Sequence, residues 1–404
     1  MFGSSTQMRS WTFKNEQELQ RLRKTANEDY VSKQLSSGTY GDPQNLLSSE
    51  EELTLVREYV RRLREFCSQF RDPRDSRIRM PVYVTTVATH YLLRFFLYNS
   101  VMDHHPKHVM HTCIYLACKI EEFYVTITDY VHNVPGSAKD KERMASMILN
   151  SELQTTQELQ FHLIVHQPYR PLEGLLIDLK ARYEGLQDAE ALRGAVELFL
   201  EKLHLTDAPL LYAPSQLALA AVTTAASKLG QNLDSYVTDI LFRDCPERLA
   251  PLVDAVRKIK RLVKAVDSAV DKSCIDALEK RLSACLNPLN DPTTEQYWIN
   301  QARIEQDDDD FPLVSSSASV DNEAIDILED DVVAEDVGGT TDPALEELKD
   351  FAVVSTGTRK SSRRQKKHQS ARKVRETAAQ FGVESARSVL DGGVIDDNDC
   401  IIDE

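Results

Sequence analysis

The first candidate for chemistry is a lysine at the end of a strongly apolar run. Residues 108–120, HVMHTCIYLACKI, place apolar side chains on every side of a helical wheel, which is typical of a helix surrounded by other helices. Lys119 closes this run, and Glu121 and Glu122 follow it. A helix C-terminus alone can explain these charges, because a lysine there faces the negative end of the helix dipole and the glutamates can begin a solvated loop.

A glutamate in a second predicted helix offers Lys119 a partner. Over residues 139–163, Ala145, Ile148 and Leu159 form one apolar stripe, and Glu152 lies four residues after Ile148 and seven before Leu159. A carboxylate on an apolar stripe is costly unless it is paired, and a nearby lysine would pair with it. A charged pair among apolar groups is a suitable centre for a docking surface.

The remaining groups of reactive residues point away from catalysis. His104, His105, His108 and His111 lie within eight residues, and His108 and His111 share a helical face, which raises the question of a metal site. No cysteine or carboxylate has a matching spacing, and Pro106 separates the two pairs. The chain also lacks a glycine-rich phosphate loop and a G-x-S-x-G nucleophile. We therefore expect no metal, no cofactor, no catalytic residues and no enzyme activity.

Composition predicts the elements that must position these residues. The chain has 404 residues, of which 42% are hydrophobic and only 14 are glycine. Its long periodic segments with few turn residues predict an all-α protein of two domains and a tail. No apolar run approaches the ~18 residues of a membrane span, and the N-terminus lacks the apolar core of a signal peptide. The seven cysteines form no CxxC pair, which is typical of reduced intracellular thiols.

Charge separates the tail from the rest of the chain. The net charge is −16, and residues 305–350 alone hold 17 acidic residues and one lysine. Residues 351–404 have a balance of +2, which leaves residues 1–304 near −2. A near-neutral folded part argues against a broad nucleic-acid surface, and we expect the tail from about residue 300 to be disordered.

Two halves of the predicted helical region repeat one pattern. Helices are expected over 15–35, 51–70, 81–97, 106–120 and 139–163, and a proline-rich linker follows at 167–171. Shifting the numbering by 108 places Pro106 on Pro214 and Ala117 on Ala225, which indicates a duplicated helical domain rather than a solenoid. We expect an N-terminal segment at 1–45, one repeat at 46–166, a second with C-terminal helices at 167–286, and the tail at 287–404.

Four stretches resemble the cyclin H group of the cyclin family. They are SWTF at 10–13, CKIEEF at 118–123, FHLIVHQPYRPLEGLLIDLKARY at 161–183 and LTDAPLLYAPSQLALAA at 205–221. The resemblance covers about residues 8–286 and is most specific in the linker stretch. The chain departs from the family at Leu93, where a lysine usually precedes the arginine, and it lacks the MRAIL docking pattern of cell-cycle cyclins.

The resemblance implies two tandem five-helix cyclin boxes with flanking helices, and it assigns a kinase-binding face. In cyclins, a lysine ending the central helix and a glutamate on the last helix of the first box face the kinase αC helix, and here these are Lys119 and Glu152. We expect Glu121 and Glu122 to be rim charges. The apolar residues expected on the same face are Leu116, Ile120, Phe123, Phe161 and Leu163.

The family also implies partners. A cyclin H-like chain would bind and activate a cyclin-dependent kinase, join an assembly-factor subunit in the CDK-activating kinase complex, and act in the cell cycle and, with general transcription factor H, in RNA polymerase II transcription. A general transcription factor that binds promoter DNA directly and a Mediator-type cyclin are the alternatives. The near-neutral folded part and the Lys119–Glu152 pair favour the kinase regulator, and the SWTF start and long C-terminal helices favour cyclin H. No direct nucleic-acid or membrane contact is expected.

A basic cluster in the tail predicts localisation in the nucleus. Residues 359–375 hold nine Lys or Arg, and such clusters serve as nuclear localisation signals. Nonspecific nucleic-acid contact and pairing with the acidic run are the other interpretations. The residues proposed for the signal are Arg359, Lys360, Arg363, Arg364, Lys366 and Lys367.

Overall fold

A computed structural model describes residues 2–37, 46–186, 188–266, 272–291, 294–300 and 303. The chain divides into two units, Met1–Asp291 and Pro292–Glu404, and the fold and site below belong to the first. Among the described residues all regular secondary structure is helical, which confirms the predicted all-α class. The predicted acidic tail and basic cluster lie outside the described residues.

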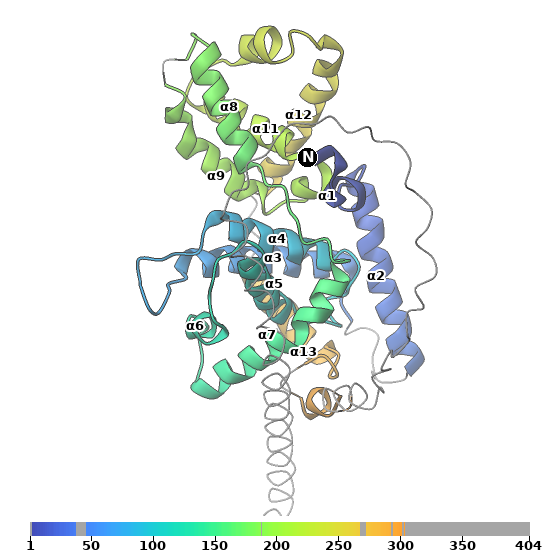
Figure 1. The fold of residues 1–404 in the computed structure, drawn as a ribbon. Coiled ribbons are helices and arrows are strands. Elements are labelled where there is room, and N and C mark those ends of the chain that lie inside the picture. The colour runs from blue at the N-terminus through green and yellow to red at the C-terminus, as the bar shows by residue number, and fades with distance from the viewer. Residues whose placement is uncertain are drawn as a thin grey trace, which may run out of the picture. The chain divides into compact units, whose positions relative to one another are not determined.

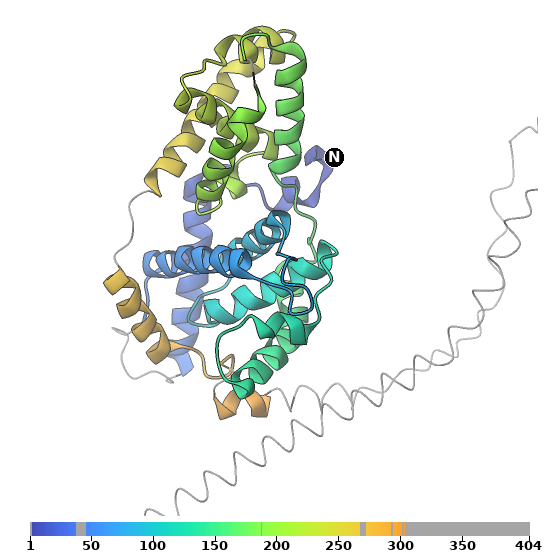
Figure 2. The same ribbon diagram turned by 90° about the vertical axis from the view of Figure 1, so that its left-hand side faces the viewer.

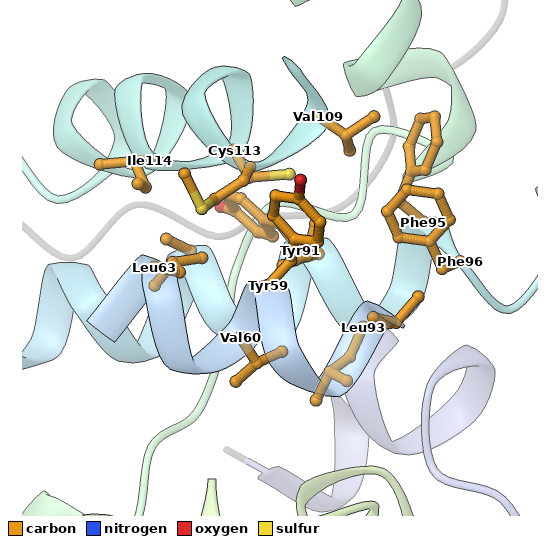
Figure 3. Close-up of a cluster of buried hydrophobic side chains, with 14 of the residues drawn as sticks. Tyr59, Val60, Leu63, Tyr91, Leu93, Phe95, Phe96, Val109, Cys113 and Ile114 are labelled. Atoms are coloured by element: carbon orange, nitrogen blue, oxygen red, sulfur yellow. The ribbon is translucent and has the colours of Figure 1, made fainter. Parts of the chain in front are cut away.

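The first repeat is built around one central helix. Its elements are α3 (Ser49–Gln69), α4 (Val82–Phe95), α5 (Pro106–Ile120), α6 (Ile127–His132) and α7 (Ala138–Glu158). Helix α5 packs against α3, α4 and α7, and its residues from Val109 to Cys118 are all buried. Figure 3 shows Cys113 and Ile114 of α5 pointing toward Leu63 and Tyr91 of α3 and α4.

The second repeat copies this arrangement. Its elements are α8 (Tyr169–Arg182), α9 (Arg193–Leu203), α11 (Pro214–Lys228), a π-helical turn (Tyr236–Leu241) and α12 (Leu249–Ala265), with the short α10 (Ala208–Leu211) before the central helix. Helix α11 packs against α8, α9 and α12, as Figure 1 shows. Because α5 and α11 have 15 residues each and begin with a proline, the structure confirms the duplication and its offset.

Local sequence sets where the main helices begin. Ser48 with Glu51, and Ser137 with Asp140, form capping boxes at the starts of α3 and α7. The predicted end of α7 is wrong, because the helix stops at Glu158 rather than continuing to residue 163. Gln160 and Phe161 then adopt left-handed backbone conformations, which a continuing helix cannot accommodate.

An N-terminal segment joins the two repeats. It consists of a short 3-10 turn (Phe2–Ser4), α1 (Thr6–Ser10) and α2 (Glu16–Ser37). Gln7 exchanges two hydrogen bonds with the backbone of His166 in the linker. The Phe13 backbone N–H donates to the Leu210 carbonyl of the second repeat, at 2.8 Å. This segment (blue in Figure 2) therefore contacts the linker and the second repeat, and Trp11 within it is fully buried.

A buried ion pair reinforces the junction. Arg23 of α2 holds Asp207, beside α10, through two hydrogen bonds of 2.6 and 3.1 Å, and Arg57 of α3 approaches the same carboxylate at 3.6 Å. Burial alone raises the pKa of Asp207, but the charges and hydrogen bonds of the two arginines outweigh it and hold that pKa below its ordinary value. A single carboxylate thus ties α2 and α3 to the second repeat.

Asp207→Asn is expected to lower the free energy of unfolding by about 1–3 kcal/mol, because Arg23 stays buried without its counter-charge. Urea unfolding at pH 7 followed by circular dichroism measures the difference. Since the folded-state pKa is depressed, the carboxylate contributes above the ordinary aspartate range and its contribution disappears as the pH falls through the folded-state pKa, below about pH 4. The gap between the two proteins should shrink there. A gap that is constant down to pH 2.5 would contradict the role of this charge.

The last helix of the first unit packs on the first repeat. Helix α13 (Lys272–Cys285) contacts α3, and Leu278, Leu282 and Cys285 belong to the same buried cluster as the first repeat. The sequence grouped this helix with the second repeat, and the contacts of α13 correct that grouping. The other domain boundaries stay predictions. Within the described ranges, no helix is both long and apolar enough to span a membrane.

Candidate functional site

The pair expected from the sequence is present. Lys119 Nζ lies 2.6 Å from both carboxylate oxygens of Glu152, because α5 and α7 pack side by side. The lysine also lies 4.9 Å from the centroid of the Tyr115 ring. Ile148 is fully buried, whereas the Glu152 side chain is 24% exposed and that of Lys119 43%. Glu152 therefore stands at the margin of the apolar stripe rather than within it, and the pair is open to a partner.

Exposed apolar side chains follow the pair along the same elements. Leu149 and Leu153 flank Glu152 on α7, and Leu153 is 62% exposed. Ile120 follows Lys119, and Phe161 and Ile164 lie in the turn after α7, where both are more than 60% exposed. Exposed apolar residues concentrated in this way mark interaction surfaces. We call these five residues with Lys119 and Glu152 the docking face.

Buried hydrogen bonds fix the turn that presents Phe161. Its backbone N–H donates to the Thr156 carbonyl at 3.0 Å, which closes the end of α7. The His162 carbonyl accepts a hydrogen bond from Arg94 Nη1 at 3.1 Å, and the Tyr91 hydroxyl donates to the Leu163 carbonyl. These contacts hold the backbone on both sides of Phe161, so that its left-handed conformation and exposed ring are set by the core.

Trp11 connects the N-terminal segment to this turn. Its Nε1–H donates to His162 Nδ1 at 3.1 Å, and the Arg94 guanidinium lies 5.1 Å from the centroid of its ring. Burial lowers the pKa of Arg94 to about 10, so the side chain remains a cation at neutral pH, and the indole face is a favourable neighbour for it. The sequence flagged Trp11 only as part of a family motif and did not connect it with the docking face.

The structure separates the other predicted site residues. Leu116 is buried in the core and offers no surface, and Phe123 and Leu163 are half-buried against that core. Glu121 is half-buried, while Glu122 is exposed with a φ of 56°. The sequence missed Leu149, Leu153 and Ile164. Leu149 and Leu153 are spaced by four residues, which was the available signal for a second stripe on α7.

Phe161→Gly is expected to weaken partner binding without lowering thermal stability. The exposed ring contributes about 1.5–3 kcal/mol if a partner buries it fully, whereas glycine relieves a left-handed backbone that costs other residues about 1–2 kcal/mol. A titration with the partner and a thermal melt separate the two effects. Gln160→Gly, which relieves the same kind of backbone strain at φ 55°, is the matched control. Equal binding by both variants would remove Phe161 from the docking face.

The histidine-rich stretch has structural contacts. His105 caps α5 by accepting a hydrogen bond from the Lys107 backbone N–H, and His111 Nδ1 lies 2.9 Å from the Tyr130 hydroxyl. Burial lowers the pKa of His111 to about 3, so the ring is neutral. Within the described part of the chain, no group of three or more His, Cys, Asp or Glu is arranged to hold a metal ion.

Comparisons with known proteins bear on the whole first unit. Residues 74–164 match the cyclin N-terminal domain and residues 167–264 match the cyclin C-terminal domain. Cyclin-H from Xenopus laevis is 41% identical over 288 residues, covering 70% of this chain and 87% of that protein. A probable cyclin-H from Echinococcus multilocularis is 30% identical over 335 residues, covering 75% and 97%.

A solved structure has the same fold. One chain of the CAK complex from Chaetomium thermophilum bound to ATP-gamma-S superimposes with a TM-score of 0.63 and covers 80% of this chain and 98% of its own length. At 21% identity, this likeness supports the architecture of the two repeats and their flanking helices.

Proposed function

The chain belongs to the cyclin family, in its cyclin H group, and we propose on this premise that it is the regulatory subunit that binds and activates a cyclin-dependent kinase of the CDK-activating kinase type. The observation that carries the proposal is the Lys119–Glu152 pair, formed at 2.6 Å and bordered by exposed apolar residues. Such a surface has the charged centre and apolar surroundings of a docking site.

The proposed mechanism needs no catalytic group from this chain. A kinase is active when its αC helix is docked and the glutamate of that helix pairs with the catalytic lysine. A partner that binds this state better than the inactive state shifts the kinase toward it. On the docking face, Leu149, Leu153 and Phe161 would bury apolar surface of αC, and Lys119 and Glu152 would hydrogen-bond the adjoining kinase backbone.

The wider assembly is part of the same proposal. We propose a trimer with an assembly-factor subunit that acts on other cyclin-dependent kinases and, within general transcription factor H, on RNA polymerase II. Cyclin-H proteins among the relatives and the fold shared with a chain of the CAK complex support this assignment. The relatives do not favour the alternative of a promoter-binding transcription factor.

Direct titration tests the proposed function. The full chain is mixed with an isolated kinase catalytic subunit of the CDK-activating type and, separately, with promoter DNA, and binding and kinase activity are measured. We expect saturable kinase binding with a rise in kinase activity, and no DNA binding at ~0.15 M salt, because the folded part is near neutral. DNA binding without kinase binding would overturn the proposal.

Nuclear localisation is proposed to depend on the basic cluster at 359–375. Replacing Arg363, Arg364, Lys366 and Lys367 by Ala is expected to shift a fluorescent fusion toward the cytoplasm, because import receptors bind clusters of positive charge. The change is made together with Glu152→Lys, so that a kinase cannot carry the protein into the nucleus. A fully nuclear combined variant would contradict this signal.

A further inference from the structure

An open cavity of about 670 Å³ lies at the meeting point of the N-terminal turn, α4, the linker and the second repeat. This volume falls in the range of sites that enclose a ligand or a partner's side chain. Its wall includes Glu121, which directly follows Ile120 of the docking face. The cavity is therefore continuous with the surface proposed to bind the kinase. The lining residues that matter are Phe2, Tyr83, Glu121, His166, Tyr169 and Arg170.

Glu121 brings an uncompensated carboxylate to this cavity. Among the described residues it makes no side-chain hydrogen bond and no ion pair, and burial raises its pKa above the ordinary value. The nearest lysine in sequence, Lys119, is already bonded to Glu152. A half-buried carboxylate without a donor is costly, and a cation that enters the cavity would remove this cost.

Aromatic rings form much of the remaining wall. Phe2 and His166 meet edge to face at 5.8 Å between ring centroids, and Tyr83 is 42% exposed. The linker holds Tyr83 in place, because Gln167 Nε2 donates to the Tyr83 carbonyl at 3.1 Å. Aromatic faces attract cations and stack with planar guanidinium groups.

Arg170 is the one cationic side chain among the lining residues. It is exposed, and the described structure contains no ion pair between it and Glu121. It therefore leaves the carboxylate available, and it would repel an incoming cation moderately while attracting an anion. The two residues give opposite predictions for the class of ligand, which makes them a matched pair for mutation.

We propose that this cavity receives an arginine side chain of the kinase partner, with its guanidinium paired to Glu121 and stacked on the aromatic wall. Arginine is preferred to lysine because its planar fork can donate two hydrogen bonds to one carboxylate while its face contacts a ring. The inference rests on the proposed function and adds a second, separate anchor beside the Lys119–Glu152 pair.

The first experiment uses a small probe and the full chain. Nα-acetyl-arginine amide is titrated while the NMR signals of Tyr83 and His166 are followed, with the citrulline analogue and inorganic phosphate in parallel. Saturable shifts with arginine alone are expected. Glu121→Gln should weaken this binding at least tenfold, and Arg170→Gln should strengthen it. Equal binding of citrulline, or binding of phosphate that Arg170→Gln abolishes, would overturn the proposal.

The second experiment uses the kinase itself. Glu121→Gln is expected to raise the Kd for the kinase about tenfold, and Glu197→Gln, an exposed glutamate of α9, should leave it unchanged. If Glu152→Ala weakens kinase binding while Glu121→Gln does not, the arginine site is wrong and the proposed function stands. If the kinase does not bind the unmodified chain at all, the proposed function fails, and the probe titration still decides whether the cavity takes a guanidinium.

Discussion

Glu152→Ala is expected to weaken kinase binding by about 2–5 kcal/mol, the cost of removing one member of a charged pair that an interface buries. The carboxylate holds Lys119 through both of its oxygens. Without it, the ammonium would be covered by the kinase with no counter-charge. Isothermal titration with the isolated catalytic subunit gives the change in Kd, and a kinase assay should show a parallel loss of activation.

Two controls separate docking from folding. Glu197→Ala removes an exposed glutamate from a helix of the second repeat and should leave the Kd unchanged. The far-UV circular dichroism of Glu152→Ala should match that of the unmodified chain, because the side chain is partly exposed and lies outside the packed core. An unchanged Kd for Glu152→Ala would show that the pair is a surface ion pair with no part in docking.

Trp11→Ala is expected to have the largest effect on stability, about 3–5 kcal/mol. The indole is fully buried, donates to His162 and covers the Arg94 guanidinium. Its loss leaves a cavity and an arginine with no aromatic neighbour inside the protein. Chemical denaturation followed by circular dichroism measures the loss, which should appear as a lower midpoint.

Trp11→Phe provides the matched control, since it keeps most of the apolar volume and removes only the N–H donor. It should cost about 0.5–1.5 kcal/mol, the usual net contribution of one hydrogen bond. The chain has two tryptophans, so Trp298→Phe makes Trp11 the sole indole fluorophore and allows its burial to be followed directly. Full stability of Trp11→Ala would mean that the N-terminal segment does not brace the docking turn.

Much of the helical core was predictable because its signals are local. Prolines at the first turns of α5 and α11 and the apolar pattern between them mark the two central helices, and their offset reveals the duplication. The Lys119–Glu152 pair was predictable for a related reason. Both charges interrupt apolar sequence, and the desolvation cost of a buried charge makes a partner necessary.

The features that could not be predicted depend on contacts between distant segments. The stretch after Glu158 contains no glycine or proline before Pro168, so local sequence favours a longer helix. Hydrogen bonds from Arg94 and Tyr91 to the following turn override that preference. Leu149 and Leu153 form a stripe that resembles a core stripe, and only the packing of α7 on α5 decides which stripe faces outward. The contact of α13 with the first repeat is likewise tertiary.

The long-range pairing of Arg23 with Asp207 also sets a schedule for synthesis. The two residues are 184 positions apart, and at about 5–20 residues per second a ribosome needs roughly 10–40 s to make the intervening chain. During that time α2 lacks its counter-charge and cannot complete its position. Trp11 also waits for His162, which is made shortly before the second repeat. The turn that displays Phe161 therefore becomes fully braced only near the end of translation of the folded part, so that a truncated chain would present an incomplete docking face to a kinase.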